Sequence, residues 1–355
     1  MHAFSYHPLP ARVRFGVGSL GKLAEELSHL DAQRALVLCT REQRSLAERV
    51  VGLLGERAAG VFDRATMHVP IEVAHAARTE AERVRADCAV AVGGGSTIGL
   101  GKAIALTSTL PIIALPTTYA GSEVTSIYGL TEGGLKRTGR DLRVLPRSVL
   151  YDPELTCTLP VDLSVTSALN AVAHAAEGLY AHDGNPITSL MAEEGIRALT
   201  QALPRIVSNP SDVAARSDAL YGAWLCGTVL GAVSMGLHHK LCHTLGGSYD
   251  LPHAPTHAVV LPYALAYNAR HAADALAAVG RSLGTTAQAV PTALRALAAN
   301  LGAPTSLQAL GLPEDALDRV ADLAVATPYP NPRPLERAAL REMLQRAYDG
   351  QEPAA

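Results

Sequence analysis

The sequence lacks the features that would indicate nucleic-acid binding, membrane insertion or a disulfide framework. It has no block of basic residues and a formal net charge of −3, so nothing in it predicts a surface for nucleic acid. No apolar run reaches membrane-spanning length, and the N-terminal MHAFSYHPLP lacks the core of a signal peptide, which together predict a cytoplasmic protein outside the membrane. The five cysteines are scattered and odd in number, which is typical of reduced thiols and not of a zinc cluster.

Charged residues, and lysine above all, are also scarce. Charged side chains make up 18% of the chain and hydrophobic ones 48%, so its 355 residues can form a large core, and the length suggests two domains. Almost all the cations are arginine, and the lysines are Lys22, Lys102, Lys136 and Lys240. A lysine that remains in such a sequence is a candidate for a position that needs a compact ammonium group.

Strand and helix patterns alternate in the first part of the chain. This order is typical of a parallel sheet with helices on both faces. From Asp162 onward the chain is rich in alanine and leucine with helical periodicity. We therefore predict an α/β domain at residues 1–158 and an all-helical domain at residues 159–355, with the active site in the cleft between them. The predicted strands are residues 34–40, 59–62, 87–92 and 110–115, and the predicted helices between them are residues 45–54 and 71–85.

Two glycine-rich stretches are candidates for binding a phosphate. GVGSLG at residues 16–21 matches the dinucleotide pattern G-x-G-x-x-G, but a charged segment precedes it and the next strand ends without an acidic residue, so a turn that caps a helix is favoured. GGGSTIGLGK at residues 93–102 follows a buried strand and opens a helix. Its glycines let backbone N–H groups approach a pyrophosphate at the positive end of the helix dipole, although a tight structural turn is the alternative. The candidate binding residues are Gly93, Gly94, Gly95 and Ser96.

A third stretch, PTTYAGSE at residues 116–123, directly follows the strand predicted at residues 110–115. Its hydroxyls therefore lie at the carboxyl end of a parallel strand, where α/β sheets hold ligands. Loops of threonine, serine and glycine are common, so this signal is weak by itself. It adds Thr117, Thr118 and Ser122 as candidates for binding the same ligand.

The histidines are concentrated in one stretch. GLHHKLCHTLGGSYDLPHAPTH, residues 236–257, holds five of the thirteen. His239 and His243 are four residues apart, so they share one face of a predicted helix that ends at the glycine pair 246–247, and His253 falls in the loop that follows. Imidazoles that converge in this way bind transition metals or move protons near neutral pH.

A second piece of the same site lies upstream. NAVAH, residues 170–174, places Asn170 one helical turn before His174, where a metal site would usually have a carboxylate. An asparagine amide is a neutral and poor metal ligand, but it can still donate a hydrogen bond. The sequence therefore predicts a site in which a divalent metal is weakly bound or absent.

Together these motifs resemble the iron-containing, group III alcohol dehydrogenase family over nearly the whole chain. The resemblance rests on FGVGSL at residues 15–20, the GGGS and PTT turns, YDP at residues 151–153, and the asparagine and histidine positions. It implies that the first domain binds NAD(P) and that the helical domain carries a divalent metal such as iron or zinc. The implied metal ligands are Asn170, His174, His239 and His253, and the implied additional active-site histidine is His243.

Three positions depart from the family pattern. Asn170 replaces the first metal-binding aspartate, and Gly99 replaces an aspartate after the glycine turn. Thr40 replaces an acidic residue that often favours NAD, and with Arg41 beside it the choice between NADH and NADPH stays open. Lys136 aligns with a family lysine near the cofactor, and a solvated loop charge is the alternative.

The versions GGGSTIGLGKAIAL, PTTYAGSEVT, SALNAVAHAAE and GLHHKLCHTLGG resemble one branch of this family, the maleylacetate reductases. This resemblance implies NAD(P)H-dependent reduction of maleylacetate, a small dicarboxylate, to 3-oxoadipate during the degradation of aromatic and chloroaromatic compounds. By analogy it also implies a homodimer.

The predicted reaction explains how the site could work without a metal. Maleylacetate has a C=C bond conjugated to a ketone, so hydride addition at the carbon β to the ketone places charge on the ketone oxygen. Hydrogen-bond donors can stabilise such an oxyanion. We predict that role for Asn170, His174, His239 and His253.

Protons and substrate carboxylates need further groups. His243 is the predicted general acid, because the ordinary histidine pKa of about 6.5 suits proton donation near neutrality. Lys240 and His238 are predicted to bind the substrate carboxylates, although an exposed helix lysine is an equal alternative for Lys240. His257 is predicted to be peripheral.

Three other functions remain open on the sequence. A metal-dependent alcohol or polyol dehydrogenase would bind iron or zinc and lose activity with a chelator. A dehydroquinate synthase, which is a lyase, would share the two-domain plan but would need more basic residues around the site. A non-catalytic NAD-binding protein would have no need for five clustered histidines.

Overall fold

The computed structural model describes residues 4, 6, 8–9, 11–108, 110–133 and 135–354, without the side chains of residues 135 and 136. The chain forms two compact units. The sheet unit consists of Pro8–Leu159 and Ser211–Leu220, and the helical unit contains Pro160–Pro210 and Tyr221–Ala355. The division after Leu159 lies one residue from the predicted boundary, whereas the assignment of Ser211–Leu220 to the sheet unit was not predicted.

The sheet unit is built on six parallel strands in the order β1-β8-β5-β4-β2-β3. Their bounds are β1 Arg12–Phe15, β2 Ala35–Leu38, β3 Ala58–Phe62, β4 Cys88–Gly93, β5 Ile112–Pro116 and β8 Ser148–Tyr151. Every residue of β2, β4, β5 and β8 is buried, as expected for parallel strands covered on both faces. The carboxyl ends of β2, β4 and β5 are neighbours, and the candidate glycine turn and hydroxyl loop follow β4 and β5.

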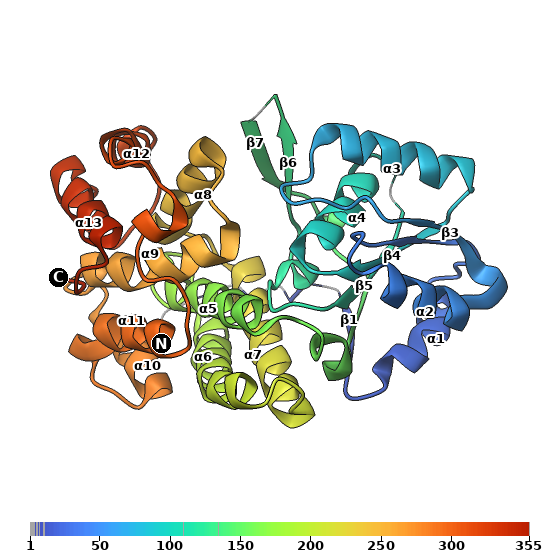
Figure 1. Ribbon diagram of the computed structural model, residues 1–355, viewed down its shortest axis with the longest axis horizontal. Coiled ribbons are helices and arrows are strands. Elements are labelled where there is room, and N and C mark those ends of the chain that lie inside the picture. The colour runs from blue at the N-terminus through green and yellow to red at the C-terminus, as the bar shows by residue number, and fades with distance from the viewer. Residues whose placement is uncertain are drawn as a thin grey trace. The chain divides into compact units, whose positions relative to one another are not determined.

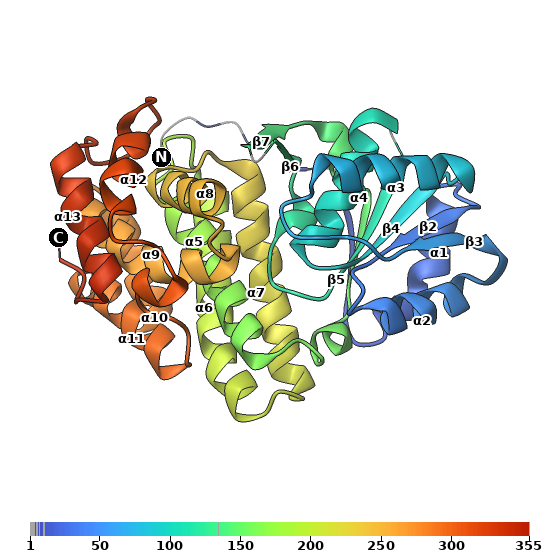
Figure 2. The same ribbon diagram turned by 45° about the horizontal axis from the view of Figure 1, so that its top comes forward.

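Helices cover both faces of this sheet (Figures 1 and 2). α1 (Leu23–His29) and α2 (Arg44–Leu54) pack their apolar side chains against one face, and α3 (Ile71–Arg83) and α4 (Gly95–Ser108) pack against the other. The four predicted strands and the two predicted helices are confirmed to within a few residues. β1 and β8 were not predicted. Both strands have only four residues, and β1 carries two arginines.

A two-stranded antiparallel hairpin stands apart from the main sheet. It consists of β6 (Ile127–Glu132) and β7 (Leu135–Arg140). Lys136 lies in β7, but its side chain is outside the described part of the chain, so its predicted role near the cofactor stays a prediction.

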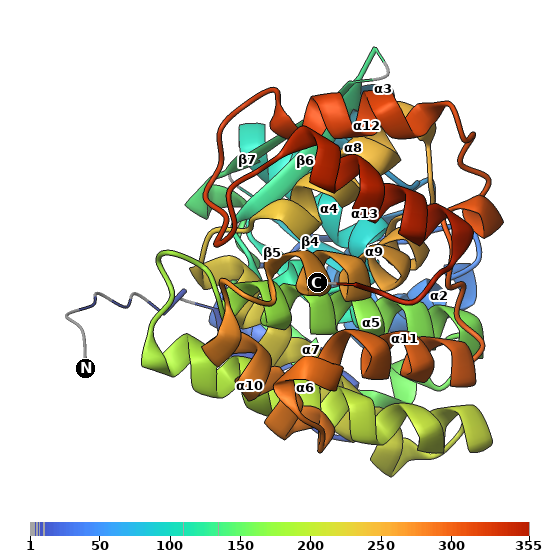
Figure 3. The same cartoon turned by 90° about the vertical axis from the view of Figure 1, so that its left-hand side faces the viewer.

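The helical unit confirms the predicted all-helical region. Its helices are α5 Val161–Gly178, α6 Pro186–Ser208, α7 Val213–Ala232, α8 Leu237–Tyr249, α9 His253–Asn268, α10 Ala273–Leu283, α11 Val290–Asn300, α12 Ala316–Val325 and α13 Arg337–Asp349, and the first turns of α7 belong to the sheet unit. α12 and α13 lie side by side and pack on α8 and α9 around one apolar cluster (Figure 3). Short 3₁₀ segments occur at Ser19–Lys22, Gly55–Arg57, Ser122–Val124, Leu142–Val144, Pro153–Thr156, Ala287–Ala289 and Gln308–Leu310.

Two local predictions for the histidine stretch were wrong. α8 does not end at the glycine pair 246–247 but continues to Tyr249 and stops at Asp250, which is in the left-handed conformation with φ 53°. His253 is not in a loop; it is the first residue of α9. The cause is packing, because Leu245 before the glycines is buried in the core shared with α9 and α12, and Tyr249 after them packs against the same core.

Among the described residues, no single helix has the length and hydropathy needed to cross a membrane; α7 and α8 would meet both only as a pair, and the chain bends by 95° between them.

Candidate active site

The turn after β4 is shaped by close contacts that leave no room for side chains. Gly93 has φ +154°, and a Cβ atom there would lie 2.5 Å from Gln43 Oε1 and 2.5 Å from Thr97 Oγ1. A Cβ atom on Gly94 would lie 2.7 Å from Thr118 Cγ2. α4 begins directly afterwards, so backbone N–H groups and the positive end of its dipole meet at this turn. This cradle fits the pyrophosphate of a dinucleotide.

The predicted hydroxyls lie at or near the same turn. Thr117 is buried, donates its backbone N–H to Gly93 O at 3.2 Å, and accepts a hydrogen bond from Gln43 Nε2 at 2.6 Å. Thr118 packs on Gly94. Ser122 begins a 3₁₀ segment, and its carbonyl accepts a hydrogen bond from Thr125 Oγ1 at 3.2 Å. Sequence reasoning missed Gln43, whose side chain reaches this turn from the loop after β2.

Thr40 begins that loop. Its hydroxyl forms a hydrogen bond with the exposed Glu42 carboxyl and lowers the pKa of that group. The family position at Thr40 has no acidic side chain, but Glu42 lies two residues later and is hydrogen-bonded to Thr40. The role of Thr40 in cofactor binding stays a prediction.

Gly99 is also constrained by a neighbour. A Cβ atom at Gly99 would lie 2.9 Å from Val69 Cγ2. Val69 has φ +46°, an unusual conformation for a β-branched residue, and its carbonyl accepts a hydrogen bond from Thr131 N at 3.1 Å. Val69 thus fills the space that the family's aspartate side chain would enter.

Lys102, on α4, donates three hydrogen bonds from its side-chain nitrogen to acceptors within the sheet unit. The side chain is buried, and Nζ donates to Thr125 O at 2.8 Å, Thr125 Oγ1 at 3.0 Å and Ile127 O at 2.7 Å. These three donors tie α4 to the segment that leads into β6. One of the scarce lysines therefore has a structural role, as its compact ammonium suggested.

The predicted histidines gather in the helical unit. The ring centroids of His174, on α5, and His239, on α8, are 4.9 Å apart, and His239 and His243 are 6.1 Å apart. His253, on α9, lies 4.4 Å from His257. His174 and His239 are buried, His253 is half-buried and His243 is exposed.

Glu177, which sequence reasoning missed, is hydrogen-bonded to two histidines of this stretch, His238 and His239. Its carboxylate accepts hydrogen bonds from His239 Nδ1 at 2.5 Å, His239 N at 3.2 Å and His238 N at 2.8 Å. Burial opposes its ionisation, but the hydrogen bond and charge of His239 outweigh it and lower the pKa of Glu177 to about 2. Its spacing from Asn170 and His174, at i, i+4 and i+7 on α5, was the available signal.

An ionised carboxylate only accepts hydrogen bonds, so Glu177 fixes the direction of a chain of bonds. In the neutral form of His239, the proton on Nδ1 leaves Nε2 as an acceptor, and His174 Nδ1 lies 2.8 Å from it as the donor. His174 must then accept at Nε2, where Asn170 Nδ2 lies at 3.2 Å. Asn170 is therefore the donor at the end of the chain, which an ionised aspartate could not be. Its Oδ1 is buried and has no partner among the described residues.

Two of the four metal ligands that the family resemblance implies are hydrogen-bonded to neighbouring side chains. The Nε2 atoms of His174 and His239, whose lone pairs a metal would need, each share a hydrogen bond within the protein. Among the described His, Cys, Asp and Glu side chains, the group whose ligand atoms come within 4.8 Å of one another is His238, Cys242 and His257. No family ligand belongs to that group.

Two histidines lie deeper in the helical unit than the sequence suggested. His238 is fully buried, its Nε2 shares a hydrogen bond with His257 Nδ1 at 2.9 Å, and burial lowers its pKa to about 3. The predicted role of His238 in substrate binding stays a prediction. His257 is not peripheral: it is also fully buried, and its ring lies 5.1 Å from that of His239. Both residues pack the inner side of the cluster.

Lys240 is half-buried on α8, and its Nζ donates to Thr327 Oγ1 at 3.4 Å. The predicted roles of Lys240 in substrate binding and of His243 as the acid stay predictions.

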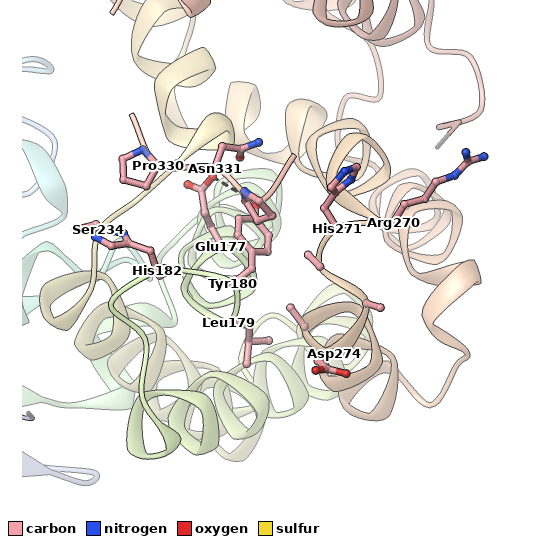
Figure 4. A pocket seen from close by; sticks show the side chains of 16 residues that line it. Glu177, Leu179, Tyr180, His182, Ser234, Arg270, His271, Asp274, Pro330 and Asn331 are labelled. Carbon is pink, nitrogen blue, oxygen red and sulfur yellow. Dashed lines mark hydrogen bonds between the residues drawn. The ribbon is translucent and has the colours of Figure 1, made fainter. Parts of the chain in front are cut away.

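Glu177 also lines a pocket of about 570 Å³ in the helical unit (Figure 4). The pocket lies among the connections that follow α5, α7, α9 and α12, and Tyr180 OH donates to Glu177 Oε1 there at 3.3 Å. None of the predicted catalytic or substrate-binding residues lines it. His182 is exposed and also lines the pocket.

Known proteins resemble this chain over its whole length. The family model described as "Iron-containing alcohol dehydrogenase" matches residues 10–153, and that described as "Fe-containing alcohol dehydrogenase family, C-terminal" matches residues 164–348. Maleylacetate reductase from Burkholderia cepacia is 62% identical over 354 residues, covering 100% of both chains. Maleylacetate reductase from Sphingobium indicum is 56% identical over 350 residues, covering 99% of both. The crystal structure of maleylacetate reductase from Agrobacterium tumefaciens has a TM-score of 0.95 at 55% identity, covering 99% of this chain and 100% of that one.

Proposed function

This chain belongs to the iron-containing alcohol dehydrogenase family, and we propose that it reduces the conjugated C=C bond of maleylacetate to give 3-oxoadipate, with NADH or NADPH as the reductant. The predicted family resemblance is confirmed. Identity of 55–62% to maleylacetate reductases over the full length supports the choice of substrate. We also propose that the enzyme is a cytoplasmic homodimer that acts in the degradation of aromatic and chloroaromatic compounds.

The reaction consumes one hydride and one proton. NAD(P)H supplies the hydride to the carbon β to the ketone, the C=C electrons move toward the ketone, and the ketone oxygen carries the charge. Protonation of the adjacent carbon then restores the ketone and completes 3-oxoadipate. The chain must therefore bind the dinucleotide, stabilise an oxyanion and deliver one proton.

The glycine turn and the hydroxyls beside it would hold the dinucleotide. Gly93 and Gly94 let the turn pack tightly against Gln43, Thr97 and Thr118, and the backbone N–H groups at the start of α4 would bind the pyrophosphate. Thr117 and Thr118 lie at this turn. Further proposed cofactor contacts are Gly95, Ser96, Ser122, Lys136 and Thr40.

We propose that the reaction needs no metal. The series of hydrogen bonds that links Glu177, His239, His174 and Asn170 supports this proposal. The chain engages the imidazole nitrogens that a metal would require and gives a neutral amide a donor role. A conjugated enone is already electrophilic, so oriented donors can stabilise the charge that develops on its oxygen. In this arrangement His174 and His239 use their N–H groups within the chain and position Asn170, so the proposed donors to the oxyanion are the second hydrogen of Asn170 Nδ2 and the ring of His253.

Proton delivery and carboxylate binding are assigned to the exposed part of α8. The ring of His243 is exposed and adjoins His239, as a donor to a bound substrate must. Lys240, three residues earlier, is the proposed partner of a substrate carboxylate.

The test is oxidation of NADH and NADPH by maleylacetate, with protein dialysed against EDTA and its metal content measured by elemental analysis. Turnover by metal-free protein is the expected result. Activity that returns only with iron or zinc would overturn the metal-free mechanism but keep the reductase. No activity on maleylacetate even then, together with metal-dependent oxidation of simple alcohols, would favour an alcohol dehydrogenase.

A further inference from the structure

The connection between α12 and α13 is rich in proline. It contains TPYPNPRP, Thr327 to Pro334, with proline at every second position, and we call this segment the proline strap. A proline ring fixes φ near about −65°, and the residue before a proline is restricted to extended conformations. Every residue of the strap is therefore restricted, so the segment is stiff and loses little conformational entropy when the chain folds.

The second half of the strap is anchored to the end of α9. The side-chain amides of Asn331 and Asn268 exchange two hydrogen bonds of 3.1 and 2.8 Å, and Asn268 is fully buried. Tyr267 OH donates to Pro334 O at 2.7 Å, and the guanidinium carbon of Arg333 lies 4.1 Å from the centroid of the Tyr267 ring. These contacts hold the strap on the helical unit.

The strap also contacts the start of α8. Gly236 is the residue before this helix, and a Cβ atom there would lie 3.0 Å from Pro330 O and 3.3 Å from Glu177 Oε1. Asn331 Oδ1 would lie 3.5 Å from the same Cβ atom. The backbone of Gly236 therefore lies against both the strap and Glu177, and Pro330, Asn331 and Glu177 line one pocket (Figure 4).

These contacts bear on the histidine cluster because Glu177 binds the first turn of α8. Its carboxylate accepts hydrogen bonds from His239 N at 3.2 Å and from His239 Nδ1 at 2.5 Å. We propose that the proline strap is a positioning element of the site: it limits movement of Gly236, keeps the first turn of α8 on Glu177 and so holds the His239 ring in place. This inference rests on the proposed function, in which His239 belongs to the series of hydrogen bonds that ends at Asn170.

The first test adds a methyl group where the strap meets α8. In Gly236→Ala the new Cβ atom has a backbone oxygen at 3.0 Å, so its neighbours must move by a few tenths of an ångström. We expect kcat for maleylacetate to fall about tenfold or more and KM to change less than about threefold, because His239 is displaced but does not bind the substrate. Gly247→Ala is the matched control, since Gly247 is an exposed residue of the same helix and a Cβ there meets nothing within 4 Å.

A second variant loosens the strap and leaves α8 and Glu177 unaltered. Asn331→Ala removes the paired amide hydrogen bonds to Asn268, and we expect kcat to fall about threefold or more. Asn300→Ala is its control, because Asn300 is an exposed asparagine at the end of α11 in the same unit. Urea unfolding identifies conditions in which every variant is folded. A purely structural role would lower the free energy of unfolding without changing kcat of the folded enzyme.

Proton NMR gives a readout that needs no substrate. The Nδ1–H of His239 is bonded to a carboxylate and is expected to give a downfield signal, which is assigned by its loss in Glu177→Gln. We expect this signal to shift or broaden in Gly236→Ala and Asn331→Ala and to stay unchanged in the two controls.

The two readouts separate the possible failures. An unshifted signal in both variants would overturn the inference whatever their kinetics, because the strap would then not act on His239. A shifted signal with wild-type kcat would overturn it as well. A wild type that does not reduce maleylacetate, with the signal still shifted in both variants, would contradict the proposed function and keep the effect of the strap on His239.

Discussion

His239 Nδ1 lies 2.5 Å from Glu177 Oε2, and this contact sets the protonation pattern of the whole histidine cluster. The carboxylate holds the proton of His239 on Nδ1. His174 then donates to His239, and Asn170 donates to His174. The negative charge that other family members place at position 170 is replaced here by an amide, while the buried charge of Glu177 remains. The site thus keeps one carboxylate, and that carboxylate is hydrogen-bonded to a histidine nitrogen.

Glu177→Gln is expected to lower kcat for maleylacetate about 10- to 100-fold, the usual cost of losing a carboxylate that orients a histidine. The amide can donate as well as accept, so the proton on His239 Nδ1 is no longer fixed. NADH binding should not change, because the glycine turn belongs to the sheet unit. Steady-state kinetics and NADH titration check this.

Glu342→Gln serves as its control, since Glu342 is an exposed glutamate of α13 in the same unit. An equal loss of kcat in both variants, or unaltered kinetics in Glu177→Gln, would refute the positioning role.

Asn170→Asp is expected to lower metal-free activity by about tenfold or more, because a buried histidine nitrogen loses its donor. The same change supplies an oxygen ligand, so binding of zinc or iron should increase. Elemental analysis of the dialysed variant and assays with and without added metal would show both effects. Full metal-free activity in this variant would mean that Asn170 does not act as a donor.

Four strands of the main sheet could be predicted because they are apolar runs, whereas the four-residue strands β1 and β8 were missed. Arg12 and Arg14 occupy alternate positions in β1, and both meet Glu26 on α1. That pairing joins residues from two elements, so the sequence does not show that the two arginines have a buried partner. A charged segment was therefore discounted as a strand, although it pairs along its length with β8.

The site was predicted in its residue types but not in its inner layer. A glutamate in an alanine-rich helix usually points to solvent, and Glu177 is buried because the first N–H groups of α8 dock on it. His238 and His239 are adjacent in sequence, yet one faces His257 and the other faces Glu177. Which histidine is inside depends on how α8 packs on α5 and α9, and spacing alone does not contain that information.

Lys102→Met is expected to reduce the free energy of unfolding by about 3 kcal/mol or more, because three buried acceptors lose their donors. Urea unfolding followed by circular dichroism measures the change. Lys22→Met is the comparison, as Lys22 forms an exposed ion pair with Glu25. A loss no larger than that of Lys22→Met would contradict the structural role of Lys102.

Acid should weaken the sheet unit through Glu26. Burial raises the pKa of this carboxyl, but hydrogen bonds from Ser148, Arg14 and Arg12 outweigh burial and hold the pKa below its ordinary value of 4.5. The folded form thus binds a proton less readily than the unfolded form. This stabilisation is complete above pH about 4.5 and is lost as the pH falls through the lower folded pKa.

Glu26→Gln should therefore flatten the loss of unfolding free energy below pH 5, which denaturant titrations at several pH values would detect. Glu48→Gln, at an exposed position of α2, should keep the wild-type slope. An unchanged slope in Glu26→Gln would show that other groups govern acid unfolding.

The contact between Val69 and the glycine at position 99 has an evolutionary consequence. With only 2.9 Å between Val69 Cγ2 and a Cβ at that position, an ancestor or descendant carrying aspartate there would need a smaller residue at 69 first. The two sites are thus epistatic, and the order of substitution matters. A return to the family's aspartate at position 99 would therefore require Val69 to shift or to be replaced.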